Sequence, residues 1–203
     1  MAFGERGNKK IKEAAELIKA GGLVIYPTET VYGLAADPFN RIAVLKVFGA
    51  KRRPLNKPLS VATSSLEKAD ELVFINEAAR KIAGAFLPGP ITMILKKKAR
   101  LPKELTAGSE KLGIRIPDHP IALRLIELAG PITATSANIT GQPAPTTAYE
   151  AKKQIGKSVD FVLDGGECKI KEPSTVIDLM EKPKIIRAGA VPEGEIEKIL
   201  EKM

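Results

Sequence analysis

Apolar and polar residues alternate along this chain in two different periods. Residues 23–26 form a short apolar run opened by Gly21 and Gly22, which predicts a buried strand. The stretch before it, residues 11–20, has apolar positions at helical spacing and ends at the same glycines, so it predicts an amphipathic helix. Both periods are therefore present within the first 26 residues.

The same two periods recur as far as the C-terminus. They predict further strands at residues 58–62, 91–96, 113–116, 132–135, 161–163 and 175–179. They predict helices at residues 41–48, 76–83 with an N-cap at Asn76, 121–128, 148–154 and, opened by Pro192, 193–202. No internal repeat, low-complexity tract or long linker interrupts this order, so we expect residues 1–203 to form one α/β domain.

Two hydroxyl groups follow the first predicted strand. Pro27 cannot donate to a central strand ladder, so the chain should leave the sheet there. In an extended segment Thr28 and Thr30 would point to one side and Glu29 to the other. Two hydroxyls on one face suit a polar ligand. The alternative is a capped loop that begins the next helix.

Polar side chains follow other predicted elements in a similar way. Lys51 and Arg53 stand two apart before a proline, which favours extended geometry and a shared face for both cations. Ser136 and Asn138 follow an apolar run with the same spacing, and Arg115 lies between two isoleucines. Guanidinium groups and hydroxyls gathered at strand ends predict a pocket for an anionic ligand.

Six short motifs in these segments carry a family resemblance. They are Pro-Thr-Glu-Thr-Val-Tyr-Gly-Leu at 27–34, Lys-Arg-Arg-Pro at 51–54, Pro-Gly-Pro-Ile-Thr at 88–92, Arg-Ile-Pro at 115–117, Ser-Ala-Asn at 136–138 and Ser-Thr-Val-Ile-Asp at 174–178. In this order, over nearly the whole chain, they resemble the YrdC-type threonylcarbamoyl-adenylate synthases. The resemblance implies a YrdC-like (RibB-like) fold, a twisted, mostly mixed sheet with flanking helices around a concave, positively charged face. It also implies a nucleotidyltransferase that makes threonylcarbamoyl-AMP and pyrophosphate from L-threonine, bicarbonate and ATP, for threonylcarbamoyladenosine in tRNA.

The resemblance also implies roles for particular residues. Nucleotide contacts are expected from Arg53, Lys57, Lys111, Ser136, Asn138 and Arg187. Threonine contacts are expected from Thr30, Arg115 and Ser174. Lys51 and Arg53 are expected to act as the catalytic cations on the reacting phosphates and carbamate. Reactions of this kind need positioning and electrostatic stabilisation more than covalent help from the protein.

Three positions depart from the family pattern. Ala62 stands where relatives often have a histidine that contacts threonine, Lys57 where many have asparagine, and Ala144 where a serine often touches the nucleotide. We therefore expect the same reaction class with a modified threonine pocket. Longer relatives carry an additional C-terminal domain that this chain is expected to lack. The intermediate is therefore expected to reach a downstream tRNA threonylcarbamoyl transferase complex through other proteins or by free diffusion.

Composition and charge exclude few classes of protein. The formal net charge of +8 favours an anionic partner. The lysine run at residues 96–98 is interpreted as a solvated face, because no aromatic residue is interleaved for base stacking. No apolar run of about 18 residues and no signal-peptide pattern occurs, so we expect a cytoplasmic protein that contacts no membrane.

The single cysteine and single histidine limit metal chemistry. Cys168 and His119 allow neither an intrachain disulfide nor a His/Cys zinc cluster. No protein metal site is expected, and Mg²⁺ is expected to arrive with ATP. Asp118 is interpreted as the cap of the following helix, with His119 in its first turn.

Two other functions remain as alternatives. One is an RNA-binding module that holds tRNA on the basic concave face without chemistry. The other is a different carbamoyl-adenylate-forming enzyme, similar to the related domain of hydrogenase-maturation proteins, which normally comes with zinc-finger and acylphosphatase-like segments.

Overall fold

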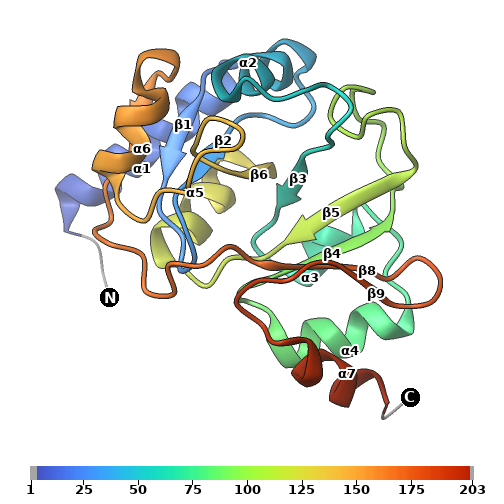
Figure 1. Cartoon of the computed structure of the whole chain (residues 1–203). Coiled ribbons are helices and arrows are strands. Elements are labelled where there is room, and N and C mark those ends of the chain that lie inside the picture. The colour runs from blue at the N-terminus through green and yellow to red at the C-terminus, as the bar shows by residue number, and fades with distance from the viewer. Residues whose placement is uncertain (1–3, 202–203) are drawn as a thin grey trace.

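A mixed nine-stranded sheet runs through the part of the chain that the computed structural model describes, residues 4–201 (Figure 1). Its strand order is β7-β1-β2-β6-β3-β5-β4-β8-β9. The strands are β1 Val24–Tyr26, β2 Gly33–Ala35, β3 Ser60–Ala62, β4 Ile91–Lys96, β5 Lys111–Arg115, β6 Ile132–Ser136, β7 Phe161–Val162, β8 Thr175–Asp178 and β9 Lys184–Arg187. The predicted α/β fold with a mixed sheet and flanking helices is confirmed.

Strand β6 joins the two halves of the sheet. It pairs antiparallel with β2 on one side and antiparallel with β3 on the other. Parallel pairs occur between β1 and β7, β3 and β5, and β4 and β8. Strands far apart in sequence therefore end beside one another, which brings their terminal side chains to one place.

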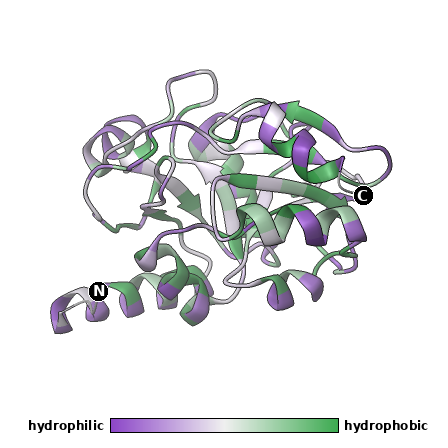
Figure 2. Cartoon of the chain, turned by 90° about the horizontal axis from the view of Figure 1, so that it is seen from below, coloured by the Kyte–Doolittle hydropathy of each residue, from purple (hydrophilic) through white to green (hydrophobic). Residues whose placement is uncertain are grey.

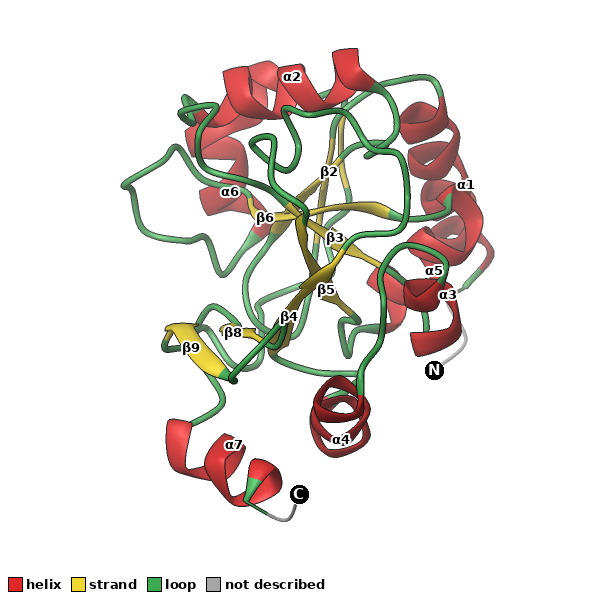
Figure 3. Ribbon diagram, turned by 90° about the vertical axis from the view of Figure 1, so that its right-hand side faces the viewer, coloured by secondary structure: helices red, strands yellow, loops and turns green. Residues whose placement is uncertain are grey.

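The helices cover the sheet unequally (Figure 3). They are α1 Glu5–Lys19, α2 Arg41–Lys51, α3 Leu66–Asp70, α4 Glu77–Phe86, α5 Pro120–Ala129, α6 Ala148–Ile155 and α7 Glu193–Leu200, with a 3₁₀ turn at Gly156–Ser158. Helices α1 and α5 pack against each other and against β1, where Val24 and Tyr26 meet Ile11 and Leu125 in one core cluster. The apolar faces of the helices point inward, with polar residues outside (Figure 2).

A larger core cluster fills the opposite face of the sheet. Helices α2, α4, α6 and α7 contribute to it, together with Ile91, Met93 and Leu95 of β4. Side chains alternate along a strand, so Thr92 must point to the other face, the one that carries α1 and α5 near β1. The cluster that α1 and α5 form reaches Ala35 of β2, Ile132 of β6 and Ala62 of β3, but it includes no residue of β4, β5 or β8. The face over these three strands is therefore left open for a site.

Capping residues were used to predict where helices begin, and the structure tests two of them. Asn76 caps α4 as predicted, with its side chain accepting from the amide of Ala79. The predicted cap at Asp118 is wrong, because α5 begins at Pro120 and its N-cap is His119, which makes no side-chain cap bond. Elements that the pattern did not predict are β2, α3 and β9. The assignment of residues 1–203 to one domain stays a prediction.

Candidate active site

A polar pocket opens on the uncovered face of the sheet, between its two halves. Its lining comes from β1, β2, β3, β4, β5, β6, β8 and β9 and from the segments that adjoin them. Three arginines and several hydroxyls face it, and no carboxylate is among its lining residues: Arg53, Arg115, Arg187, Thr28, Tyr32, Ser60, Thr92, Thr135, Ser136 and Ser174. Such a lining favours an anionic ligand.

Glycine makes room for this pocket at the centre of the sheet. A Cβ atom on Gly113 of β5 would lie 2.3 Å from Ser60 Oγ and 3.4 Å from Thr92 Cγ2. Both neighbours line the pocket. Gly113 does not line the pocket itself, and its missing side chain leaves room for the two short polar side chains that do.

The segment after β1 is bent rather than extended. The Thr28 hydroxyl accepts from the amides of Thr30 (3.2 Å) and Val31 (3.3 Å) and donates to the Val31 carbonyl (2.6 Å). The expectation of an extended segment is wrong, because this side chain offers the backbone a local turn. The alternative, a loop that begins a helix, is also wrong, since β2 follows. The hydroxyls of Thr28 and Thr30 nevertheless meet, 2.9 Å apart.

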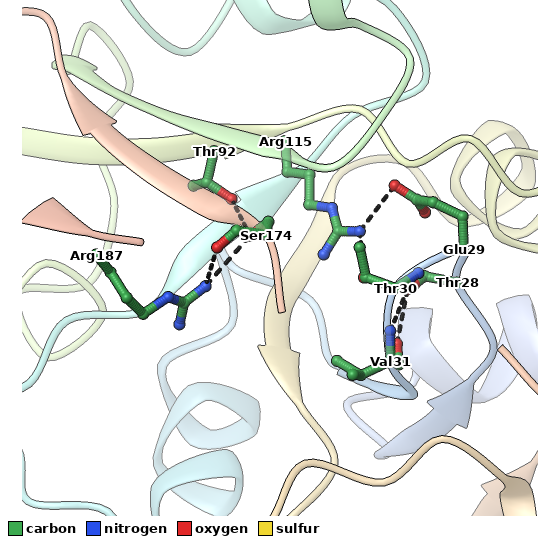
Figure 4. Close-up of polar contacts among 8 residues, drawn as sticks. All are labelled: Thr28, Glu29, Thr30, Val31, Thr92, Arg115, Ser174 and Arg187. Carbon is green, nitrogen blue, oxygen red and sulfur yellow. Dashed lines mark hydrogen bonds and ion pairs between the residues drawn. The ribbon is translucent and has the colours of Figure 1, made fainter. Parts of the chain in front are cut away.

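Arg115 reaches this bend from the end of β5 (Figure 4). Its Nη2 donates to Glu29 Oε1 at 2.9 Å and to Thr30 Oγ1 at 2.5 Å. Glu29 and Thr30 therefore lie on the same side, toward Arg115, contrary to the alternation expected from the sequence. Thr30 is fully buried and does not line the pocket itself, but its hydroxyl accepts from Arg115, which does.

Arg187 and Ser174 form a second polar group in the pocket (Figure 4). Arg187 Nη2 donates to the Ser174 carbonyl at 2.6 Å and contacts its hydroxyl at 3.3 Å. The Ser174 and Thr92 hydroxyls are 2.9 Å apart. Burial lowers the pKa of Arg187, and the charge of Arg115 lowers it further. The two guanidinium groups thus repel each other, and an anion between them would relieve that repulsion.

Arg53 completes the set of pocket cations. Its Nε donates to the Lys57 carbonyl at 2.9 Å and its Nη2 to the Pro58 carbonyl at 2.8 Å, so its side chain fixes the turn before β3. Burial lowers its pKa, and the charge of Arg187 lowers it further. Electrostatic repulsion therefore links all three arginines.

Lys51 lies behind the pocket rather than in it. It is the last residue of α2 and 1% exposed, and its Nζ donates to the carbonyls of Ser136 and, at 2.9 Å, Asn138. Burial lowers its pKa to about 7, with a smaller contribution from the charge of Arg53. The expected shared face of Lys51 and Arg53 is wrong, because the helix ends at Lys51 and Arg52 turns the chain with φ 47°.

Ser136 and Asn138 form the rim beside Lys51. Their side chains are hydrogen-bonded at 2.5 Å, and Ser136 lines the pocket. Asn138 is 7% exposed and donates to the carbonyls of Ile139 and Gln142, so it fixes the loop after β6 instead of lining the cavity.

Besides Asn138, two further predicted nucleotide contacts lie outside the pocket lining. Lys57 is exposed, and it is its carbonyl that holds Arg53. Lys111 lies at the far end of β5 from Arg115 and forms an ion pair with Asp178, N to O 2.5 Å. Hydrogen bonding to Asp178 raises the pKa of Lys111. Contact of either residue with a nucleotide stays a prediction.

Sequence reasoning missed several residues of the site. Ser60 and Thr92 lie inside predicted strands, at positions whose facing partners depend on the strand order. Tyr32 donates to the carbonyl of Gly166 at 2.7 Å and so ties the first motif to a loop 134 residues away. Glu29 was placed on the wrong side of its segment. Only the spatial order of the strands reveals these neighbours.

Two absences concern residues 4–201, the part of the chain that the structure describes. That range contains no group of three or more His, Cys, Asp or Glu side chains that could hold a metal ion. None of its helices is long and apolar enough to cross a membrane.

Known proteins match this chain over most of its length. The sequence profile of the family Sua5_yciO_yrdC, described as "Telomere recombination", matches residues 16–189. A threonylcarbamoyl-AMP synthase of Pyrococcus abyssi is 44% identical over 194 residues, 94% of this chain. The chain spans 57% of the length of that relative.

Two further comparisons agree with this match. A Methanocaldococcus jannaschii protein is 42% identical over 194 residues, which cover 93% of this chain and 91% of that protein. The crystal structure of P. abyssi Sua5 complexed with L-threonine aligns with a TM-score of 0.92 and 43% identity, over 95% of this chain and 58% of that one. The chain therefore belongs to the Sua5/YciO/YrdC family.

Proposed function

We propose that this protein is a threonylcarbamoyl-AMP synthase, a nucleotidyltransferase that uses L-threonine, bicarbonate and ATP. The observation that carries the proposal is the pocket in which Arg53, Arg115 and Arg187 face one cavity without a lining carboxylate. The Pyrococcus relative bears this activity in its name, and the homologous structure contains L-threonine. Three cations suit a reaction that gathers a carboxylate, a carbamate and a triphosphate.

The reaction has two bond-forming steps. The threonine amine adds to carbon dioxide derived from bicarbonate, and loss of a proton gives the carbamate. A carbamate oxygen then attacks the α-phosphorus of ATP, and the bond to pyrophosphate breaks. Charge builds on the phosphate oxygens in this step, so guanidinium groups held in advance lower the barrier.

The chain's residues divide this work between two substrates. Arg115 binds the threonine carboxylate and Ser174 a smaller polar group, while Thr30, buried beside Arg115, acts on threonine through its bond to that arginine. The nucleotide half is assigned to Arg53, Lys57, Lys111, Ser136, Asn138 and Arg187. Lys51, together with Arg53, acts on the reacting phosphates and carbamate, through the rim that it holds in place.

Cofactor, partner and location follow from the same proposal. Mg²⁺ arrives with ATP and supplies charge neutralisation on the phosphates. The adenylate passes to a tRNA threonylcarbamoyl transferase complex, and the protein works in the cytoplasm.

Labelled bicarbonate tests the proposal directly. Protein, ATP, Mg²⁺, threonine and labelled bicarbonate together should give a labelled adenylate and pyrophosphate, and omission of threonine should abolish both. Equal pyrophosphate release without threonine would identify an ATPase or another transferase instead.

A further inference from the structure

Among the described residues, Glu29 carries the one carboxylate that contacts an arginine of the pocket. Its Oε1 accepts from Arg115 Nη2 at 2.9 Å. The residue is 4% exposed, and its Oε2 is buried without a hydrogen-bond partner, as is Arg115 Nε. A buried carboxylate is costly unless it is paired, so its contact with Arg115 is enforced by its surroundings.

The backbone delivers this carboxylate to a fixed place. The Thr28 hydroxyl closes the bend around Glu29 by accepting from the amides of Thr30 and Val31. The Glu29 carbonyl accepts from the amide of Ile170 at 2.8 Å, which ties the bend to the loop that precedes Ser174. Both sides of Glu29 are therefore held, and its side chain has little freedom to leave Arg115.

Pairing with Glu29 makes Arg115 unlike the other two arginines. Arg53 and Arg187 donate to backbone carbonyls and keep their full charge for a ligand. Arg115 shares its charge with Glu29, and its Nη2 is occupied twice. A triphosphate therefore finds its strongest attraction at Arg53 and Arg187.

We propose that Glu29 is a positioning residue that holds Arg115 for the amino-acid carboxylate and leaves Arg53 and Arg187 to the nucleotide. This inference rests on the proposed function and refines it, because it explains how one pocket separates two anionic substrates. Without Glu29, Arg115 keeps only its bond to Thr30 at this bend and carries an unshared charge that the phosphates attract, so the threonine carboxylate loses its oriented partner.

Steady-state kinetics of Glu29→Gln test this role. The KM for threonine should rise by about tenfold to a hundredfold, the value of one oriented charge-assisted bond, while the KM for ATP changes less than about threefold. Glu104→Gln is the matched control, because Glu104 is also buried (9% exposed), ion-paired to Arg41 at 2.7 Å, and left with a buried unpartnered Oε2. Neither Glu104 nor Arg41 lines the pocket. The Glu104→Gln variant should lose thermal stability as Glu29→Gln does, while its KM for threonine and its KM for ATP stay unchanged.

A double-mutant comparison tests whether Glu29 acts through Arg115. In an Arg115→Gln background, adding Glu29→Gln should raise the threonine KM by less than about twofold, since the shared contact is already gone. This comparison does not depend on the Glu29→Gln single variant. The double variant buries no unpaired charge, whereas the Arg115→Gln reference leaves the Glu29 carboxylate without its partner, so urea unfolding of both variants accompanies the kinetics.

The outcomes separate the two proposals. An active wild type whose threonine KM is unchanged by Glu29→Gln, or multiplicative effects of the two substitutions, would overturn the positioning role alone. A wild type without threonine-dependent pyrophosphate release would refute the proposed function, and this inference with it.

Discussion

At the scale of single residues, the buried amine of Lys51 makes stability depend on pH. Burial lowers its pKa in the folded protein from 10.5 to about 7. Between pH 7 and pH 10.5 the Lys51 amine is protonated in the unfolded chain and mostly deprotonated in the folded protein. Stability from this group is therefore lowest below pH 7 and rises with pH through this window.

Lys51→Met should remove this dependence. Between pH 7.5 and 9.5 the wild type should gain up to about 1.4 kcal/mol of unfolding free energy per pH unit relative to the variant, the limit for one proton. Urea unfolding of both proteins at several pH values measures the difference. The loss of donors to Ser136 and Asn138 adds an offset that does not depend on pH. Parallel stability curves would mean that Lys51 stays protonated in the folded protein.

Arg53 and its neighbour Arg52 offer a second residue-scale comparison. Arg53→Ala should lower kcat/KM for adenylate formation by about 30- to 1,000-fold, the effect of losing about 2–4 kcal/mol of transition-state stabilisation. Arg52→Ala is the control, because Arg52 is exposed and does not line the pocket. It should keep near-normal turnover. A folded Arg53→Ala protein with normal turnover would remove Arg53 from the catalytic set.

Sequence reasoning about single residues succeeded where the backbone was regular. Arg115 ends a strand predicted from its flanking isoleucines, and it lies in the pocket as expected. Glu29 and Lys51 were misplaced because both arguments assumed extended backbone. A threonine hydroxyl bends the first segment, and a left-handed residue follows the helix in the second. Such local geometry follows from contacts that a pattern of apolar positions does not contain.

At the scale of elements, the N-cap of α4 also anchors a strand. Asn76 accepts from the amide of Ala79 at 2.9 Å, and its Nδ2 donates to the carbonyl of Leu179, just after β8, at 2.6 Å. Thr147, the N-cap of α6, accepts from the amide of Glu150 at 3.2 Å. The two caps therefore differ in what their removal leaves unpaired.

Asn76→Ala should be the more destabilising of two cap deletions. We expect Asn76→Ala to lower the free energy of unfolding by about 2–3 kcal/mol, because it removes the cap and also leaves the Leu179 carbonyl without its donor. Thr147→Ala removes only a cap, so we expect a loss of about 1 kcal/mol. Asn76→Asp keeps the cap and loses the donor, so its stability should fall between wild type and Asn76→Ala. Urea denaturation at neutral pH compares the variants. Equal losses in the two alanine variants would show that the bond to Leu179 contributes nothing.

The elements missed from the sequence share a physical cause. Strand β2 is Gly33-Leu34-Ala35, so unlike the equally short β1, Val-Ile-Tyr, it shows no run of large apolar residues, and β9 is mostly exposed at the edge of the sheet. Helix α3 has five residues. Longer elements with a buried face, such as β4 and α5, were predicted within a few residues because burial imposes the period that a pattern detects.

At the scale of the whole molecule, the pocket spans both halves of the sheet. Ser136 lines it from the half that contains β1 and β2, while Arg187 and Ser174 line it from the half that ends in β9. A ligand that contacts all of them should stabilise the two halves together.

Hydrogen exchange with saturating Mg²⁺–ATP tests this expectation. Amides of β6 and of β9 should both exchange more slowly in the presence of ligand. The first turn of α1, which lies far along the chain from any lining residue, should be unaffected. Protection confined to one half would place the nucleotide outside the pocket described above.

The spread of the lining residues along the chain also has a consequence for folding. Lining residues run from Tyr26 to Arg187, and neighbours in the pocket such as Thr28 and Arg115 are brought together by closing long loops. Closing long loops costs entropy before any contact compensates for it, so pairings of this kind form late and slowly. A chain of this protein that has formed its helices but has not closed these loops has no binding site. The first moment at which it can bind a nucleotide therefore reports that folding is complete.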